Sequence, residues 1–88
     1  MIFKTGKAFE KQLDKLKSKD LDRAVLKIYD QVGAANSLSD IPNIKKLKGF
    51  QTCYRIRYKD YRIGFAYQDN TLFFMAIAHR KNIYNIFP

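Results

Sequence analysis

The spacing of apolar residues changes along this chain from a helical repeat to a two-residue repeat, and this change constrains the fold more than any other feature. In residues 1–34 the apolar side chains recur at the three- and four-residue intervals of amphipathic helices. From Cys53 onward they alternate with polar residues, as in strands that bury one face. The chain is therefore expected to fold as an α+β protein, with helices packed on one face of a sheet.

Two helices are expected in the first part of the chain. The first should bury three residues that share one helical face, namely Phe9, Leu13 and Leu16. The second follows the i, i+3, i+4 pattern at Leu21, Ala24, Val25, Ile28 and Val32. Thr5 can cap the first helix, Ser18 or Asp20 can cap the second, and Gly33 should end it. The short connection predicts an antiparallel helix hairpin.

Strands and turns account for most of the remaining residues. Met1–Lys4 is expected to form an edge strand, and Ala34–Phe50, which is rich in turn formers, an irregular connector. Leu72–Ala78 is almost continuously apolar, which predicts a central strand covered on both faces. His79–Pro88 is a basic and aromatic tail to which the pattern assigns no structure. The predicted order is β-α-α-β-β-β in a mostly antiparallel sheet, and residues 1–88 are expected to form one domain.

The register of the sheet follows from its turns, which are expected at Lys59–Asp60 and Asp69–Asn70. A two-residue loop at the first turn pairs Tyr58 with Tyr61. One face of this strand pair then carries six apolar side chains for the helices to cover: Tyr54, Ile56, Tyr58, Tyr61, Ile63 and Phe65. The opposite face places Arg57 across from Arg62, and Arg55 across from Gly64.

Arginines that face each other across two strands suggest an anion-binding surface. Like charges in this position destabilise a strand pair, and an anion bound between them relieves the repulsion. The planar fork of arginine also matches the oxygens of a phosphate. Gly64 lacks a side chain, so a gap is expected there into which a ligand backbone fits. The alternative is that these arginines are simply solvated on the exposed face of the sheet.

The charge of the chain is concentrated in its second half. Residues 43–88 carry nine basic and two acidic side chains, a net of +7, whereas residues 1–42 carry eight basic and six acidic ones, a net of +2. A surface this basic is typical of proteins that bind nucleic acid. An acidic protein or an anionic membrane surface would be the competing partner.

Composition argues against several other classes of protein. Cys53 is the only cysteine, so no internal disulfide is possible, and a reducing cytoplasm is the expected location. There is no apolar run long enough to cross a membrane and no signal-peptide segment at the N-terminus. A zinc site is not expected with one histidine and one cysteine, and neither a magnesium site nor a nucleotide-binding glycine motif is present. No metal or other cofactor is therefore predicted.

Several elements of the basic half recur in one order in a known family. They are the Leu47–Gly49 turn, the strand with Arg55 and Arg57, the Asp60–Ile63 segment, the apolar strand Leu72–Ala78, the His79–Arg80 pair and Tyr84. With the helix hairpin before them, they give the chain a pattern that resembles the RelE/ParE superfamily of bacterial toxins. The resemblance implies a curved, mostly antiparallel RelE-like sheet.

The resemblance also implies a function. RelE-like toxins are held inactive by an antitoxin and cleave mRNA when free, many of them in the A site of the ribosome, whereas ParE-like members poison DNA gyrase. The arginine cluster and Tyr84 fit the RNase branch better. The expected partners are thus an acidic antitoxin, mRNA and the ribosomal A site, with no membrane partner. A gyrase inhibitor and an inactive binding module of the same fold remain as alternatives.

The resemblance also implies roles for individual residues, according to their positions in the family pattern. Arg62 and Arg80 are expected to contact the scissile phosphate with help from Arg57, and Tyr84 or His79 to transfer a proton. A second group is expected to bind the RNA backbone, and it comprises Lys45, Lys46, Lys48, Arg55 and Lys81. His79 could equally be a packed histidine, Tyr84 a core residue, and the three lysines of the connector a solvated loop.

Overall fold

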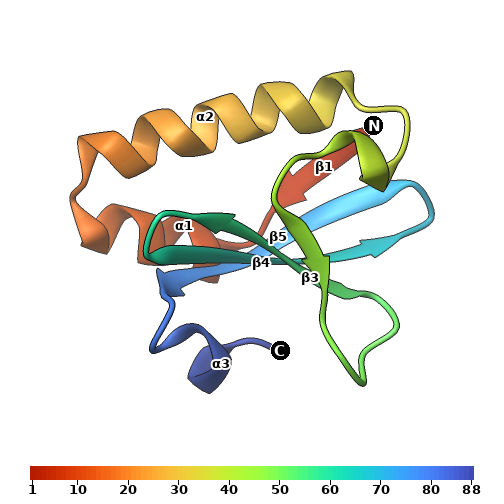
Figure 1. Ribbon diagram of the computed structural model, residues 1–88. Coiled ribbons are helices and arrows are strands. Elements are labelled where there is room, and N and C mark those ends of the chain that lie inside the picture. The colour runs from red at the N-terminus through yellow and green to blue at the C-terminus, as the bar shows by residue number, and fades with distance from the viewer.

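In the computed structural model, which describes residues 1–88, two helices cover one face of a five-stranded sheet, and a short third helix lies on the other face (Figure 1). The helices are α1 (Lys7–Leu16), α2 (Lys19–Ala34) and α3 (Ile83–Ile86), with a 3₁₀ turn at Leu38–Asp40. The strands are β1 (Ile2–Thr5), β2 (Ile44–Lys46), β3 (Cys53–Tyr58), β4 (Tyr61–Gln68) and β5 (Thr71–His79). The sheet order is β1-β5-β4-β3-β2, and only the β1–β5 pair is parallel. The predicted α+β fold is confirmed. None of the helices is long and apolar enough to cross a membrane.

The helix hairpin forms as expected, although two of its predicted ends are wrong. The Ser18 hydroxyl accepts a hydrogen bond from the Leu21 backbone N–H at 3.2 Å, which confirms the cap of α2. Gly6, not Thr5, precedes α1, because Thr5 is still paired in β1. The second helix continues through Gly33 and ends at Ala34, where the extended backbone of Ala35 closes it.

The segment predicted to be an irregular connector contains a strand. β2 pairs antiparallel with β3 and places Lys45 beside Arg55. The prediction was wrong because three residues at a sheet edge are too few to produce a recognisable two-residue repeat. The first strand, in contrast, lies at the opposite edge of the sheet as expected.

The predicted register of β3 and β4 is confirmed at every position. Tyr58 pairs with Tyr61, Arg57 with Arg62 and Arg55 with Gly64. The turn residue Lys59 has a φ of 52°, the left-handed backbone that a tight hairpin needs. The six apolar side chains of the pair pack with α1 and α2 in the main core, so the arginines are on the opposite face.

A bulge in β5 changes which residues of that strand face the helices. Gly64 pairs with Ala76 and Phe65 with Phe74, which leaves Met75 without a partner. Alternation is therefore reversed after Met75. The expectation that β5 is covered on both faces holds only near Ala76, because Phe73 and Met75 are 39% and 43% exposed.

The predicted gap at Gly64 does not exist. A Cβ atom added there would lie 2.4 Å from the ring of Phe87, which fills this space. Phe87 belongs to a second, smaller core with Leu47, Ala76 and Ile83, which holds α3 against the sheet. The missing side chain of Gly64 thus admits the C-terminal segment of the protein and not a ligand.

Replacing Gly64 with alanine should destabilise the protein, because the new methyl group overlaps the Phe87 ring. The expected loss in the free energy of unfolding is about 1–3 kcal/mol, the usual cost of overpacking. Gly33→Ala is the matched control, since nothing lies within 4 Å of its added Cβ and the position is helical. That variant should gain roughly 0.5–1 kcal/mol in urea unfolding. Equal stability of the two variants would contradict the proposed packing.

Candidate functional site

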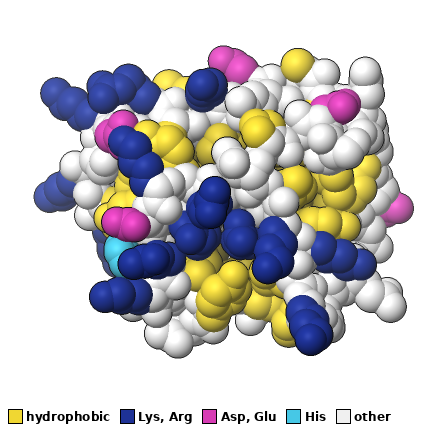
Figure 2. All heavy atoms as spheres, in the orientation of Figure 1, with side chains coloured by type: hydrophobic (Ala, Val, Ile, Leu, Met, Phe, Trp, Pro, Cys, Tyr) yellow, Lys and Arg dark blue, Asp and Glu magenta, His cyan; other side chains and the backbone are white.

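The sheet face opposite α1 and α2, called here the basic face, carries the positive side chains of the central strands. Two neighbouring rows lie on it: Arg57 beside Arg62, and Lys45 beside Arg55 and Gly64. Figure 2 shows Lys and Arg side chains gathered in a band across the middle of the molecule. The register thus brings together the arginines that the sequence placed on one face.

Arg62 lies at the centre of this group and is held in place. Its Nη1 donates hydrogen bonds to the backbone oxygens of Lys59 and Tyr61, both at 2.9 Å. Burial lowers the pKa of the Arg62 guanidinium, and the charges of Arg55, Arg57 and Arg80 lower it further. The group still remains charged near neutral pH. An anion at this position would both satisfy its Nε and Nη2 donors and relieve the repulsion.

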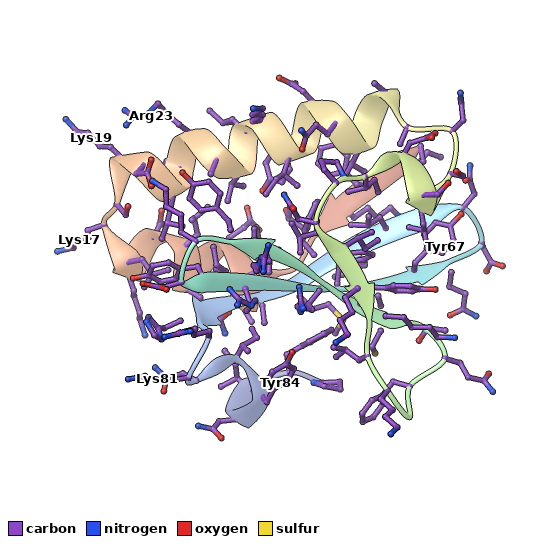
Figure 3. The ribbon with its side chains drawn as sticks, in the orientation of Figure 1. Lys17, Lys19, Arg23, Tyr67, Lys81 and Tyr84 are labelled. Atoms are coloured by element: carbon purple, nitrogen blue, oxygen red, sulfur yellow. The ribbon has the colours of Figure 1, made fainter.

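Arg80 and Tyr84 approach the same centre from the end of β5 and from α3. The Arg80 backbone N–H donates to the Asp60 carbonyl oxygen at 2.7 Å, and its Nε lies 3.8 Å from the Asp60 carboxylate. This exposed pair is weak and leaves Arg80 able to bind a second anion. Tyr84 is 58% exposed and lies below the sheet, on the side opposite α2 (Figure 3). Tyr84 is therefore not a core residue.

His79 does not join the group. It pairs with Tyr61, and the two rings meet edge to face with centroids 5.6 Å apart on the side of α1. Its Nδ1 accepts a hydrogen bond from the Lys81 backbone N–H at 3.1 Å. The bulge at Met75 is the reason, because uninterrupted alternation from Phe73 would have put His79 on the basic face.

Only one of the predicted RNA-binding lysines lies on the basic face itself, and the others lie at the sheet edge or in loops. Lys45 lies on the basic face, whereas Lys46 alternates to the side of Tyr54 at the sheet edge. Lys48 is in the loop between β2 and β3, and Lys81 is exposed in the turn before α3. Other cations, labelled in Figure 3 at the α1–α2 turn, lie far from Tyr84: Lys17, Lys19 and Arg23. No group of three or more His, Cys, Asp or Glu side chains comes together as a metal site would require.

Asp20 is a supporting residue that was expected only as a possible helix cap. From α2 its carboxylate accepts hydrogen bonds from the Tyr58 hydroxyl at 3.0 Å and from Lys59 Nζ at 3.1 Å. Lys59 in turn supplies a backbone oxygen to Arg62, so α2 holds the turn that positions the central arginine. The pairing joins residues that are distant in the chain, so no local pattern indicates it.

The sequence and the fold of the chain are similar to those of known proteins. The family model described as "ParE toxin of type II toxin-antitoxin system, parDE" matches residues 4–84. The chain is 44% identical over 62 residues to toxin RelE3 of Methanocaldococcus jannaschii, covering 69% of this chain and 70% of the relative.

Solved structures agree with this match. The RelB–RelE antitoxin–toxin complex from Methanococcus jannaschii contains a chain that is similar over the whole length of both, with 35% identity and a TM-score of 0.80. The archaeal RelE–RelB complex from Pyrococcus horikoshii OT3 matches 90% of this chain and 93% of its own, with a TM-score of 0.70. At 23% identity the second match concerns the fold alone.

Asp20→Asn should destabilise the protein in a pH-dependent way. Hydrogen bonds from Lys59 and Tyr58 hold the pKa of the Asp20 carboxyl below its ordinary 3.8. The carboxylate therefore contributes stability fully above that value and loses it as pH falls through the lower folded pKa. The difference in melting temperature between wild type and variant should be largest near pH 6 and should disappear below pH 3. Asp22→Asn is the control, because that carboxylate has no hydrogen bond or ion pair, and a gap that persists in acid would contradict this role of Asp20.

Proposed function

The chain belongs to the RelE/ParE superfamily of toxins of type II toxin–antitoxin systems, and on this premise we propose that it is a metal-independent endoribonuclease that cleaves mRNA on its basic face. The observation that carries the proposal is the convergence of four guanidinium groups, those of Arg55, Arg57 and Arg80 around that of Arg62, with Tyr84 beside them. A cluster of cations with unused donors, one of which is held by two backbone oxygens, suits a phosphodiester that gains charge in its transition state.

RNA supplies its own nucleophile for this reaction. The 2′-oxygen bonds to phosphorus while the bond to the 5′-oxygen breaks. The 2′-proton passes to a water molecule, and the 5′-oxygen takes up a proton from the protein. The products are a 2′,3′-cyclic phosphate and a 5′-hydroxyl. Because the phosphate acquires extra negative charge on the way, its stabilisation by arginine is the main contribution expected from the protein.

The structure supports different roles for the four arginines. Arg62 is the main phosphate ligand, because two backbone oxygens already fix its guanidinium. Arg80 and Arg57 bind the phosphate from either side, and Arg55 with the neighbouring lysines binds the flanking backbone. A fixed arginine loses less entropy on binding than a mobile one, and this favours the transition state.

Tyr84 is assigned the proton transfer to the 5′-oxygen. It is the one candidate for this step that reaches the basic face, since His79 lies on the side of α1. A phenol can donate a proton to an oxygen within hydrogen-bond distance.

Two partners follow from the proposal. The substrate is mRNA on the translating ribosome, where the net +7 of residues 43–88 meets a dense array of phosphates. The inhibitor is an antitoxin with an acidic segment that covers the basic face. The similar chain from Methanococcus jannaschii was solved in a RelB–RelE antitoxin–toxin complex, which supports a partner of this kind.

Arg62→Ala should lower the rate of mRNA cleavage at least about 10²–10³-fold, because it removes the fixed phosphate ligand. The measurement is primer extension on mRNA from a purified translation reaction, with circular dichroism to verify folding. Arg23→Ala on α2 removes the same charge outside the basic face and should cleave like wild type. A folded Arg62→Ala protein with unchanged activity would overturn the site.

A gyrase inhibitor is the alternative function, and the parDE description of the matching family model favours it. The same wild-type preparation can be assayed for inhibition of DNA supercoiling by gyrase. Inhibition of DNA supercoiling with intact mRNA would select that function and overturn the ribonuclease.

Tyr84→Phe should separate proton transfer from stacking. The variant keeps the ring and loses the hydroxyl, so single-turnover cleavage should slow by roughly 10²–10⁴ while RNA affinity is retained. Tyr84→Ala should lose both. Cleavage by Tyr84→Phe at the wild-type rate would remove the tyrosine from the chemistry and leave a binding role only.

A further inference from the structure

A shallow depression beside the basic face is lined by lysines and two exposed aromatic rings. Its volume is about 290 Å³, and its lining residues are Lys45, Lys46, Leu47, Lys48, Phe50, Tyr84 and Pro88. Phe50 is 48% exposed and Tyr84 58%. No acidic residue contributes to the lining. Phe50 has no role in the reaction described above.

The loop that carries Phe50 has a defined conformation. The Leu47 backbone N–H donates to the Cys53 oxygen at 2.9 Å, and that of Phe50 donates to the Leu47 oxygen at 3.2 Å. Gly49 has a φ of 85°, which makes the turn possible without strain. Leu47 is buried in the small core with Ile83 and Phe87. The same core thus anchors both sides of the depression, the Phe50 loop and α3 with Tyr84.

The depression is continuous with the arginine cluster. Lys45 lines it and is also the cross-strand neighbour of Arg55, which lies next to Gly64 and the Arg57–Arg62 row. Positively charged side chains therefore form a continuous row from the Phe50 loop to the proposed site of cleavage. A strand of RNA bound along this path keeps a phosphate near a positive charge at each step.

We propose that this depression is a subsite for unpaired RNA bases, in which Phe50 stacks on a base next to the scissile phosphate. Proteins that hold single strands combine a positive groove with aromatic rings on which bases stack, and such a ring needs no particular base. Lysines alone could bind an acidic peptide equally well, but the two exposed aromatic rings favour a nucleobase as the ligand of the depression. The inference deepens the ribonuclease proposal and rests on it for the substrate. Phe50 is a positioning residue and not a catalytic one.

The absence of tryptophan from the chain makes the stacking measurable. Phe50→Trp introduces a single tryptophan at the depression, which can be excited at a longer wavelength than the six tyrosines of the chain. A single-stranded RNA with 2′-O-methyl groups is the probe, because its blocked 2′-oxygens prevent cleavage. Saturable quenching of the tryptophan by this RNA is expected, with little change for a duplex of the same length or for polyglutamate.

Phe73→Trp is the matched control, since Phe73 is 39% exposed on the same sheet face and does not line the depression. That variant should show no quenching. Equal quenching of both variants, or quenching of Phe50→Trp by polyglutamate as strong as by RNA, would overturn the subsite.

A second variant tests the consequence for catalysis. Phe50→Ala should bind the probe about tenfold more weakly and raise KM by a similar factor, with kcat close to wild type. Phe50→Tyr should restore binding, and Phe73→Ala should leave it unchanged. Wild-type affinity and KM in a folded Phe50→Ala protein would contradict the inference.

The two proposals can fail separately. Quenching by the blocked RNA, with no cleavage of the matching unmodified RNA free or translated, would overturn the ribonuclease and keep the base subsite. Cleavage without quenching would overturn the subsite and keep the ribonuclease.

Discussion

Tyr58 pairs with Tyr61 across a two-residue turn, and this pairing sets the register of β3 against β4. Because side chains alternate along a strand, this one pairing decides the face of every residue in β3 and β4. It directs six apolar side chains into the core and three arginines out of it. A slip of one residue would bury the arginines under the helices, so the stability of the core and the geometry of the site are set together.

Repulsion between the arginines destabilises the site, and neighbouring polar groups offset part of this repulsion. Arg57 and Arg62 face each other with Arg55 beside them. Burial lowers the pKa of Arg62, and the repulsion from the neighbouring arginines lowers it further. Backbone oxygens of the β3–β4 turn solvate part of the Arg62 guanidinium, and Asp20 secures that turn from α2. The repulsion that remains favours binding of a phosphate, and this is how the fold prepares the basic face for its proposed substrate.

Local patterns were sufficient for the register and insufficient for contacts between distant segments. The alternation and the turn at Lys59–Asp60 predicted each pair of β3 and β4, because both signals lie within a few residues. The gap at Gly64 was predicted wrongly because Phe87 comes from a tail whose structure no repeat indicated. The bulge at Met75 cannot be recognised in a run of apolar residues, so the sequence left open whether His79 transfers a proton or packs against its neighbours. Phe50 was overlooked, although an aromatic residue next to Gly49 in a lysine-rich loop was a usable signal.

The proposed site binds one stretch of RNA with four arginines, since Arg57, Arg62 and Arg80 contact the scissile phosphate and Arg55 the adjoining backbone. The chain contains only one further arginine, Arg23. The most direct test follows the Nε–Hε signals of all five in proton–nitrogen correlation spectra while an RNA blocked at its 2′-oxygens is added. Shifts with one common affinity are expected for Arg55, Arg57, Arg62 and Arg80, and none for Arg23. Shifts confined to one or two of the four, or an equal response from Arg23, would contradict it.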